Sequence, residues 1–548
     1  LPEKKDAQVS GITAFLSMGL FKQGFLGRSM RFLTVKNVGT VGSMTLVSRV
    51  TGLVRDIAFA QFLGSGALAD AFFVAFRIPN FFRRIFGEGA LSVAFVPVYS
   101  EFETRYPLVE VRAFLNIMAG RLGLVLILFT VVGVVSAPTL VTVMAPGFMD
   151  DPVRFESTVS ALRLTFPYLF FISLVALAGG ILNTHDRFGV PAATPILLNL
   201  CLIGTLWIFV PSSQNAAVVL GGGVLVAGLV QLGFQFPFLS RVGRLPTPRL
   251  RANTDDEKAG AEGVGQVFRL MVPAIFGVSI AQINLLINTV LASFLVTGSV
   301  SWLYYSDRLM EFPLGVFGIA LATVILPVLS RQVAESDDDN YRATLDWALR
   351  LVFLICLPAA AALAILAFPL MVTLFQYGAF SADDAVMASR ALAAFAVGLT
   401  GFVLVKVLAP GFYARKDTRT PVVVGAISMV INAIVALALV WHLAHVGLAL
   451  ATSIAGLVNA ALLYRKLKRS GYFEAGQGWA RFLVRLVFAT IGMAVALYFG
   501  QGGQIAWLEA TLMERVARLF ILIIVGAIAY FGSLYLMRVR VHQLLERP

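Results

Sequence analysis

Residues 90–100, ALSVAFVPVYS, and residues 320–330, ALATVILPVLS, repeat one pattern within a chain of 548 residues. Alanine, leucine, proline, valine and serine keep their places in both copies, which lie 230 positions apart. The same shift aligns residues 186–191, DRFGVP, with residues 416–421, KDTRTP, and superimposes their final prolines. Two matches at one offset indicate an internal duplication. The sequence therefore predicts two homologous lobes.

The composition places these lobes in a membrane. Hydrophobic residues make up 58% of the chain and charged residues only 13%, a balance that excludes an ordinary soluble domain of this length. A hydrocarbon core about 30 Å thick takes roughly 20 apolar residues per helical span. We therefore predict an all-α polytopic membrane protein with about fourteen spans. Their centres lie near Leu53, Val74, Ile127, Ile172, Leu200, Ala227, Ile283, Ile319, Ala360, Val397, Ile427, Ile454, Ile491 and Ile524.

The spans fall into groups around the duplication. We predict an N-terminal extension over residues 1–36, six spans over residues 37–240, a cytoplasmic linker over residues 241–265 and six spans over residues 266–470. Residues 471–548 would add two further spans and a cytoplasmic tail outside the repeat. Because each lobe has an even number of spans, the repeats are parallel and their axis runs along the membrane normal. This plan is typical of transporters, whose sites lie between repeats that rock against each other.

The charge of +13 is distributed unevenly between the loops. Lys and Arg gather in alternate connections such as residues 241–258 and 465–469, whereas the intervening loops 64–66 and 378–384 carry none. By the positive-inside rule the basic loops are cytoplasmic, and an even number of spans puts both termini on that side. This placement explains the basic charge, so no nucleic-acid partner is predicted.

The chain offers no pattern for catalysis or metal binding. Cys201 and Cys356 lie in apolar runs, and the four histidines lack the spacing of metal ligands. Walker, serine-hydrolase and zinc-protease motifs are also missing from the sequence. We predict a transporter and not an enzyme, with no catalytic residue, metal or cofactor. Transport would be driven by the membrane potential, an ion gradient or downstream consumption of the product.

Charges interrupt the first span at residues 48–56, SRVTGLVRD. An Arg or Asp at the centre of a span costs about 2.5–3.5 kcal/mol, so Arg49, Arg55 and Asp56 must face water or one another. Arg49 and Arg55 lie roughly 120° apart on a helix, which lets both border a broad groove. We predict that they face a hydrated cavity between the lobes, and that Asp56 orients Arg55.

Further charges lie in spans of both lobes. They are Asp70, Arg83, Arg84 and Glu88 in the second span, Asp307, Arg308 and Glu311 in the eighth, and Lys406 in the tenth. Arg84 and Glu88 have i,i+4 spacing and would pair. A guanidinium forms bidentate hydrogen bonds with phosphate oxygens and stays charged at every physiological pH. Arginines that converge from both lobes therefore predict a phosphate or pyrophosphate ligand. The alternative is that single arginines are neutralised by neighbours, Arg55 by Asp56 and Arg308 by Asp307.

Three stretches carry a family resemblance. Residues 48–102 (SRVTGLVRD to SEF), 301–330 (SWLYYSDRLMEFPLG onward) and 406–422 (KVLAPGFYARKDTRTPV) closely resemble the MurJ (MviN) family of bacterial lipid II flippases. The similarity covers about residues 37–538. That family belongs to the MOP exporter superfamily, which has two six-helix lobes, and MurJ proteins add two C-terminal helices.

The resemblance implies a substrate and a set of site residues. The substrate would be lipid II, an undecaprenyl-pyrophosphate bearing the peptidoglycan disaccharide-pentapeptide, moved to the periplasmic leaflet of the inner membrane. Pyrophosphate binding is implied for Arg49, Arg55 and Arg308, and gating or substrate contact for Arg83 and Asp70. A groove formed with the last two spans would take the lipid tail. Membrane lipids and cell-wall synthesis proteins are the other candidate partners.

The residues themselves leave two alternative functions open. One is a MOP-type exporter of another lipid-linked oligosaccharide or of a cationic drug, although a drug site would offer acids and aromatics in place of arginines. The other is a membrane scaffold that recruits cell-wall enzymes through its cytoplasmic loops. The eleventh span, residues 421–441, shows no acidic cluster for sodium, so the coupling ion also stays open.

Overall fold

The structure, a computed structural model, describes residues 40–539, except for the side chains of residues 88, 256, 276–278, 280, 281, 319 and 320. The predicted extension over residues 1–36, the tail residues 540–548 and the Glu88 side chain lie outside the described residues. Within the described range every regular element is helical, and ten helices are long and apolar enough to cross a membrane. The prediction of an all-α polytopic protein is confirmed.

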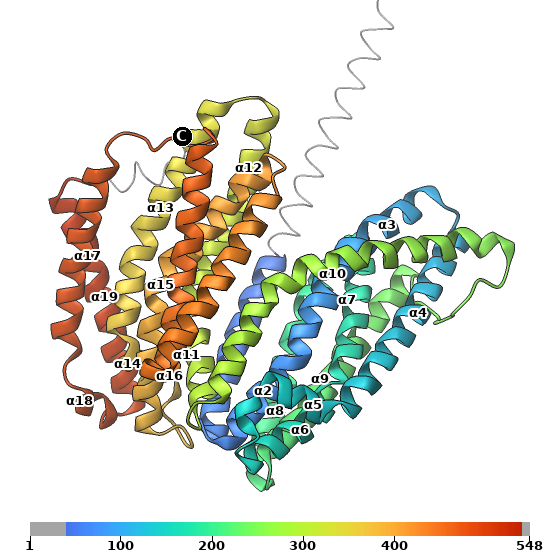
Figure 1. Cartoon of the computed structure of the whole chain (residues 1–548), viewed down its shortest axis with the longest axis horizontal. Coiled ribbons are helices and arrows are strands. Elements are labelled where there is room, and N and C mark those ends of the chain that lie inside the picture. Colours follow the sequence, from blue (N-terminus) through green and yellow to red (C-terminus); the bar gives the residue numbers. More distant parts are fainter. Residues whose placement is uncertain (1–39, 540–548) are drawn as a thin grey trace, which may run out of the picture.

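The first lobe, blue to green in Figure 1, begins with a helix described over residues 40–63. It continues with α2 (Ala67–Arg83), η1 (Arg84–Leu91), α3 (Ser92–Arg105), α4 (Leu108–Val135), α5 (Ala137–Met144), η2 (Pro146–Phe148), α6 (Pro152–Thr165), α7 (Tyr168–Thr184), α8 (Gly189–Ile208), η3 (Val210–Ser212) and α9 (Ala216–Val242). Together α6 and α7, residues 152–184, form one stretch that is long and apolar enough to cross a membrane.

After the short η4 (Asp255–Glu257) the chain continues into the connecting helix α10 and the second lobe, lime green to red in Figure 1. The elements of this part of the chain are α10 (Lys258–Ser293), α11 (Ser299–Pro313), η5 (Leu314–Gly318), α12 (Ile319–Ala334), α13 (Asp338–Ile365), α14 (Ala367–Phe375), α15 (Ala382–Ala414) and α16 (Arg419–Arg469), followed by α17 (Trp479–Gln501), α18 (Gln504–Leu508) and α19 (Leu512–Leu536). A straight helix as long as α16 would measure roughly 76 Å, about twice a bilayer. Non-helical backbone at Ala444 divides it into two crossings.

The element boundaries confirm the duplication. The π-helical segments η1 and η5 begin at Arg84 and Leu314, which are 230 positions apart. The helices α8 and α16 begin at Gly189 and Arg419, separated by the same shift. In each lobe an α-helix therefore passes through a π-helical segment into a second α-helix. Such segments are rare in helices and often lie at functional sites.

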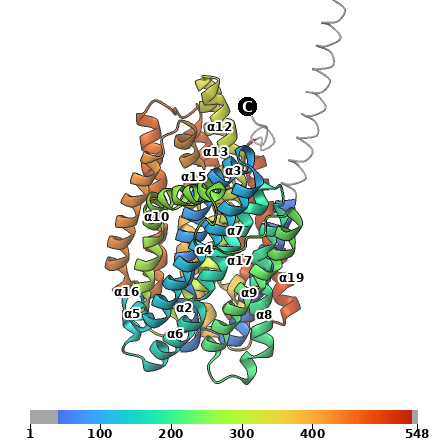
Figure 2. The same cartoon turned by 90° about the vertical axis from the view of Figure 1, so that its right-hand side faces the viewer.

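The long helix α10 connects the lobes. Its first turns bury Val264, Val267 and Met271 in the core of the first lobe, whereas its later part contacts α16 of the second. Pro273 removes a helical hydrogen bond between these parts, and Figure 2 shows α10 crossing the first lobe before it turns. The predicted linker, residues 241–265, therefore includes the first residues of α10, because the chain is helical from Lys258 onward.

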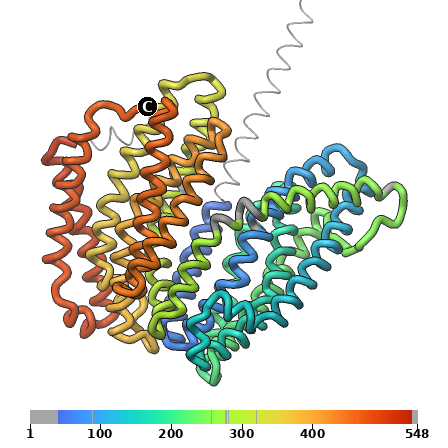
Figure 3. Tube along the Cα trace, viewed as in Figure 1, coloured from blue at the N-terminus to red at the C-terminus, as the bar shows by residue number. Residues whose placement is uncertain are grey.

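The lobes meet at one end and diverge toward the other, as the trace in Figure 3 shows. We call the end with the loops 64–66 and 294–298 the closed end, and the end with residues 243–257 the open end. At the closed end the backbone N–H of Ala379 donates to the carbonyl of Gln61 over 2.9 Å, which joins the second lobe to the first.

The two C-terminal helices α17 and α19 pack against each other and against α13 and α14, at the outer edge of the second lobe (Figure 1). The buried Arg515 guanidinium fixes the start of α19, because it donates to the carbonyls of Trp507 over 2.9 Å and Val372 over 3.3 Å. These helices stand outside the repeated architecture.

Candidate substrate-binding cavity

A cavity of about 820 Å³ lies between the lobes. The helix over residues 40–63 and α8 line it from the first lobe, and α11, α13 and α14 line it from the second. Its charged lining residues are Arg49, Arg55, Asp56, Arg308 and Glu311. The prediction that Arg49 and Arg55 border a shared space between the lobes agrees with this geometry.

Arg55 is buried and donates to three partners, Asp56, Asn199 and, over 3.3 Å from Nη2, the Tyr304 hydroxyl. Its Nε and Nη2 donate to Asp56 Oδ1 over 3.0 and 2.7 Å, and its Nη1 donates to Asn199 Oδ1 over 2.9 Å. The Tyr304 hydroxyl of the second lobe donates to the same Asp56 oxygen over 2.8 Å. The Asn199 amide also donates to the carbonyl of Ser48 over 3.1 Å. Arg55 is thus neutralised by Asp56, and the pair is fixed by groups from both lobes.

Arg308 approaches this pair from α11. Its Nη1 bonds Glu311 over 2.8 Å, and its Nε lies 3.8 Å from Asp56 Oδ2. Its guanidinium also stacks 5.0 Å from the Tyr304 ring centre, a favourable cation–π geometry. In the alternative interpretation Arg308 would be neutralised by Asp307, but the ion pair that the structure describes is with Glu311, three residues further along the helix. With its side chain 36% exposed, Arg308 remains open to a ligand.

Arg49 lies against the π-helical segment η5. A Cβ added at Gly315 would sit 2.0 Å from Arg49 Nη1, so glycine is the residue that lets the guanidinium approach the backbone there. Within the part of the chain that the structure describes, Arg49 forms no ion pair. It is therefore the cavity cation with the least internal compensation.

Other predicted site residues lie apart from the described cavity lining. Arg83 bonds an asparagine of its own helix over 3.0 Å, and the exposed Arg84 donates to Gln282 over 3.4 Å. Asp307 is not among the described lining residues, and Lys406 is exposed on α15. The predicted pairing of Arg84 with Glu88 falls partly on a side chain outside the described residues.

Asp70 is fully buried at the closed end, where it joins α2 to the start of α11. Its carboxylate accepts hydrogen bonds from the backbone N–H groups of Gly298 and Ser301 over 2.8 and 2.9 Å, and from the Ser301 hydroxyl over 2.6 Å. A carboxylate at a helix N-terminus satisfies free N–H groups and complements the helix dipole. We call this arrangement the Asp70 cap. Beside it Asp384 accepts from Trp302 over 2.9 Å and from Ser65.

Sequence reasoning missed Asn199, Tyr304 and Gly315. Asn199 gave a signal, because it is a lone amide within the apolar run over residues 189–208. Tyr304 adjoins the charged residues of its span but resembles an ordinary interface aromatic. Nothing in the local sequence distinguishes Gly315, since its role depends on a side chain from the other lobe.

Relatives of this chain are found by sequence over almost its whole length. A protein of Haemophilus influenzae described as "Probable lipid II flippase MurJ" is 42% identical over 517 residues, covering 92% of this chain and 100% of that protein. The "Lipid II flippase MurJ" of Burkholderia cenocepacia is 39% identical over 503 residues, covering 91% and 96% of the two chains.

Solved structures share the fold. The structure titled "Lipid II flippase MurJ, inward closed conformation" superimposes with a TM-score of 0.74 at 25% identity, covering 91% of this chain and 99% of the other. An inward-facing multidrug resistance MATE transporter of the MOP superfamily has a TM-score of 0.62 at 16% identity, covering 79% and 98%, which shows a common fold alone. The family described as "Lipid II flippase MurJ" matches residues 59–518. This chain, a multi-pass membrane transporter, therefore belongs to the lipid II flippase MurJ family.

Proposed function

We propose that this chain moves lipid II from the cytoplasmic to the periplasmic leaflet of the bacterial inner membrane by alternating access. The observation that carries the proposal is the meeting of Arg49, Arg55 and Arg308 in one cavity between the lobes. These three cations face two lining carboxylates, Asp56 and Glu311, so the cavity keeps an excess positive charge. A pyrophosphate would complete the compensation and would accept forked hydrogen bonds from the guanidinium groups.

An apolar wall supports a lipid-linked ligand. Leu363, Leu370 and Leu374 of α13 and α14 line the cavity together with the arginines. The same two helices carry α17 and α19 on their other side. The polyprenyl tail is proposed to leave the cavity along this wall toward the C-terminal pair, while the headgroup stays among the charged residues.

Alternating access would exchange the closed and open ends. In the proposed orientation the open end faces the cytoplasm, since the linker there carries Arg244, Arg249 and Arg251, and both termini are cytoplasmic. The Asp70 cap and the Asp384 contacts would break when the periplasmic end opens. The lobes over residues 37–240 and 266–470 are proposed to rock against each other, with α10 as their connection.

Translocation by the purified protein tests this function. The full chain would be reconstituted into vesicles, and the lipid II reaching the opposite leaflet would be measured with a leaflet-selective reagent. Translocation above that of empty vesicles supports the proposal, and repeating the assay with an imposed membrane potential tests coupling. Transport of a cationic dye without movement of lipid II would favour a drug exporter. Function that survives loss of the cavity arginines would favour a scaffold.

The contact between Arg49 and Gly315 gives a first specific prediction. Gly315→Ala is expected to lower the translocation rate about two- to threefold, because the Arg49 guanidinium, the end of a flexible side chain, moves away from the new methyl group and out of its place against η5. Gly318→Ala is the matched control, since its Cβ would meet its nearest neighbour at an ordinary 3.4 Å. Equal rates for both variants in the leaflet-selective assay would contradict this role of Gly315.

A further inference from the structure

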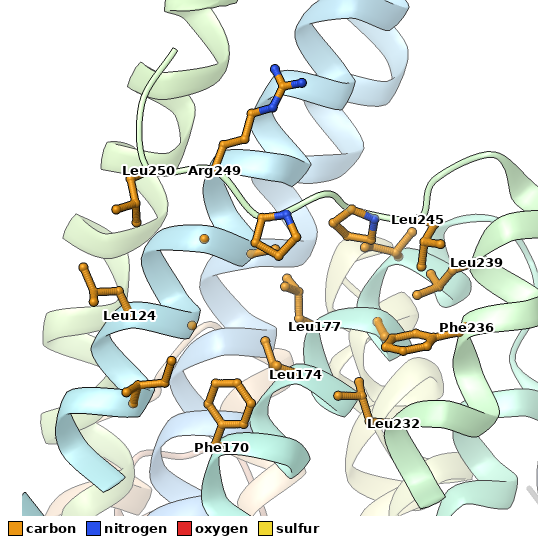
Figure 4. A pocket seen from close by; sticks show the side chains of 18 residues that line it. Leu124, Phe170, Leu174, Leu177, Leu232, Phe236, Leu239, Leu245, Arg249 and Leu250 are labelled. Atoms are coloured by element: carbon orange, nitrogen blue, oxygen red, sulfur yellow. The ribbon is translucent and has the colours of Figure 1, made fainter. Parts of the chain in front are cut away.

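A second cavity lies on the first lobe, apart from the one that holds the arginines. It measures about 550 Å³, within the range of ligand-binding sites, and is bounded by α4, α7, α9 and the linker. Figure 4 shows its wall of apolar side chains, including Leu124, Phe170, Leu174, Leu177 and Phe236. The described linings of the two cavities share no residue.

The linker forms a fixed roof over this second cavity. The roof consists of the linker residues that line the cavity, namely Leu245, Pro246, Pro248, Arg249 and Leu250. The side chain and the carbonyl of one α4 residue, Asn116, hold it, because they accept from the backbone N–H groups of Thr247 over 2.7 Å and Arg249 over 2.9 Å.

The linker backbone also lies directly on α4. A Cβ added at Gly120 would come within 2.1 Å of the Arg249 carbonyl oxygen. Arg121 donates to the Leu250 carbonyl over 3.0 Å and ties down the far side of the roof. The roof is therefore part of the fold and not a loop that rests loosely on the surface.

The open side of this cavity faces the surroundings of the lobe. Leu124, Ile127 and Phe236 are 44%, 49% and 47% exposed, and they belong to helices that are apolar enough to cross a membrane. In a membrane protein the medium beside these residues is lipid hydrocarbon. A hydrocarbon chain that enters under the roof would cover apolar surface without leaving any polar group unpaired.

Two arginines, Arg249 and Arg251, lie at the rim of the roof. In Figure 4 the Arg249 side chain extends from the roof away from the apolar wall. Its ion pair with Glu257 is long, 3.5 Å, and its side chain is 44% exposed. Arg251 follows in the chain and is exposed. A phosphate beside the roof could reach both guanidinium groups while a chain attached to it lies below.

We propose that this cavity binds one acyl chain of an anionic phospholipid, with the headgroup phosphate held by Arg249 and Arg251. The apolar wall fits the chain and the basic rim fits the headgroup. Such a lipid fastens the linker to the first lobe at the point where the chain turns into α10. The proposal concerns a resident membrane lipid and is independent of the transported substrate.

A photoreactive lipid tests the site. The purified full chain would be placed in phosphatidylcholine vesicles that contain a trace of phosphatidylglycerol with a diazirine at the end of one chain. After irradiation, mass spectrometry of peptides should find label concentrated in residues 119–127, 170–181 and 232–239. Phosphatidylcholine with the same diazirine should label these peptides at least about fivefold less, because it has no net negative charge.

Matched variants separate the site from the general lipid surface. Gly123→Leu fills the cavity, since no atom lies within 4 Å of its added Cβ, and should reduce the label about tenfold. Gly204→Leu on α8 has the same free space and should leave the label unchanged. Leu124→Trp fills the cavity from its exposed rim and covers the case in which Gly123→Leu misfolds. Arg249→Gln should abolish the preference for phosphatidylglycerol.

Three results would overturn the proposal. The first is equal label in the unchanged chain and in both filling variants. The second is equal label from the two diazirine lipids, which would show that the site does not select an anionic headgroup. The third is loss of the label when lipid II is added, which would make the substrate tail the occupant.

Discussion

Arg308→Ala is expected to reduce lipid II translocation about a hundredfold. A charge-assisted hydrogen bond contributes about 1.5–3 kcal/mol, and an arginine facing a pyrophosphate can make two of them. The change also removes the excess positive charge of the cavity, because two arginines would then face Asp56 and Glu311. Arg308→Lys keeps the charge but cannot form the bidentate hydrogen bonds of a guanidinium, so an intermediate rate is expected. The leaflet-selective assay with reconstituted protein measures all three rates.

The control for this prediction is Arg331→Ala. Arg331 is an exposed arginine of α12 that pairs with Glu335 over 2.9 Å, outside the described cavity lining. The Arg331→Ala protein is expected to translocate lipid II at the rate of the unchanged chain. Thermal melting of each purified variant distinguishes loss of the site from loss of the fold. Unchanged translocation by a folded Arg308→Ala protein would rule out the pyrophosphate role.

Asp70→Ala is expected to open the closed end. The substitution leaves the backbone N–H groups of Gly298 and Ser301 without their acceptor, and an unsatisfied buried donor costs about 1–3 kcal/mol. A loss of about 3 kcal/mol shifts the equilibrium between two conformations by more than about a hundredfold. The alternative conformation, in which water can satisfy these donors, should then be populated. Asp70→Asn should behave similarly, because one half of its side chain is itself a donor.

Disulfide trapping measures this shift. Gln61 and Ala379 lie on opposite lobes, share a backbone hydrogen bond of 2.9 Å and are both exposed to an oxidant. Cysteines at these two positions, with Cys201 and Cys356 replaced by alanine, should cross-link readily in the parent chain and much more slowly with Asp70→Ala. Asp383→Ala, an exposed change at the same end, should not alter the cross-linking rate. Identical rates for the Asp70 and Asp383 variants would show that the Asp70 cap does not hold the lobes together.

The lobes and their spans could be predicted because they depend on local and periodic patterns. The apolar runs locate the helices, and the shift that relates residues 90–100 to 320–330 also relates the starts of η1 and η5. The break at Ala444 and the helical start at Lys258 carry weaker local signals. Helix ends depend on caps and packing, so the start of α10 inside the predicted linker could not be located from the sequence.

The candidate site was predicted in part for the same kind of reason. A buried charge is expensive in a membrane, so Arg49, Arg55 and Arg308 had to face a cavity or a partner. The free-energy cost of burying an arginine does not indicate which acidic side chain pairs with it. Arg308 pairs with Glu311 and not with Asp307, because the helix places residues three apart on one side.

By itself the sequence determined that this chain is a duplicated helical membrane protein with cationic groups inside it, because hydrophobicity, periodicity and the cost of burying charge act along a single chain. Only the tertiary structure decided how those groups are used. Asp56 and Tyr304 join the two lobes around Arg55, Gly315 makes space for Arg49, and Asp70 caps a helix of the opposite lobe. These roles depend on contacts between residues that are hundreds of positions apart in the chain, and local patterns do not specify them.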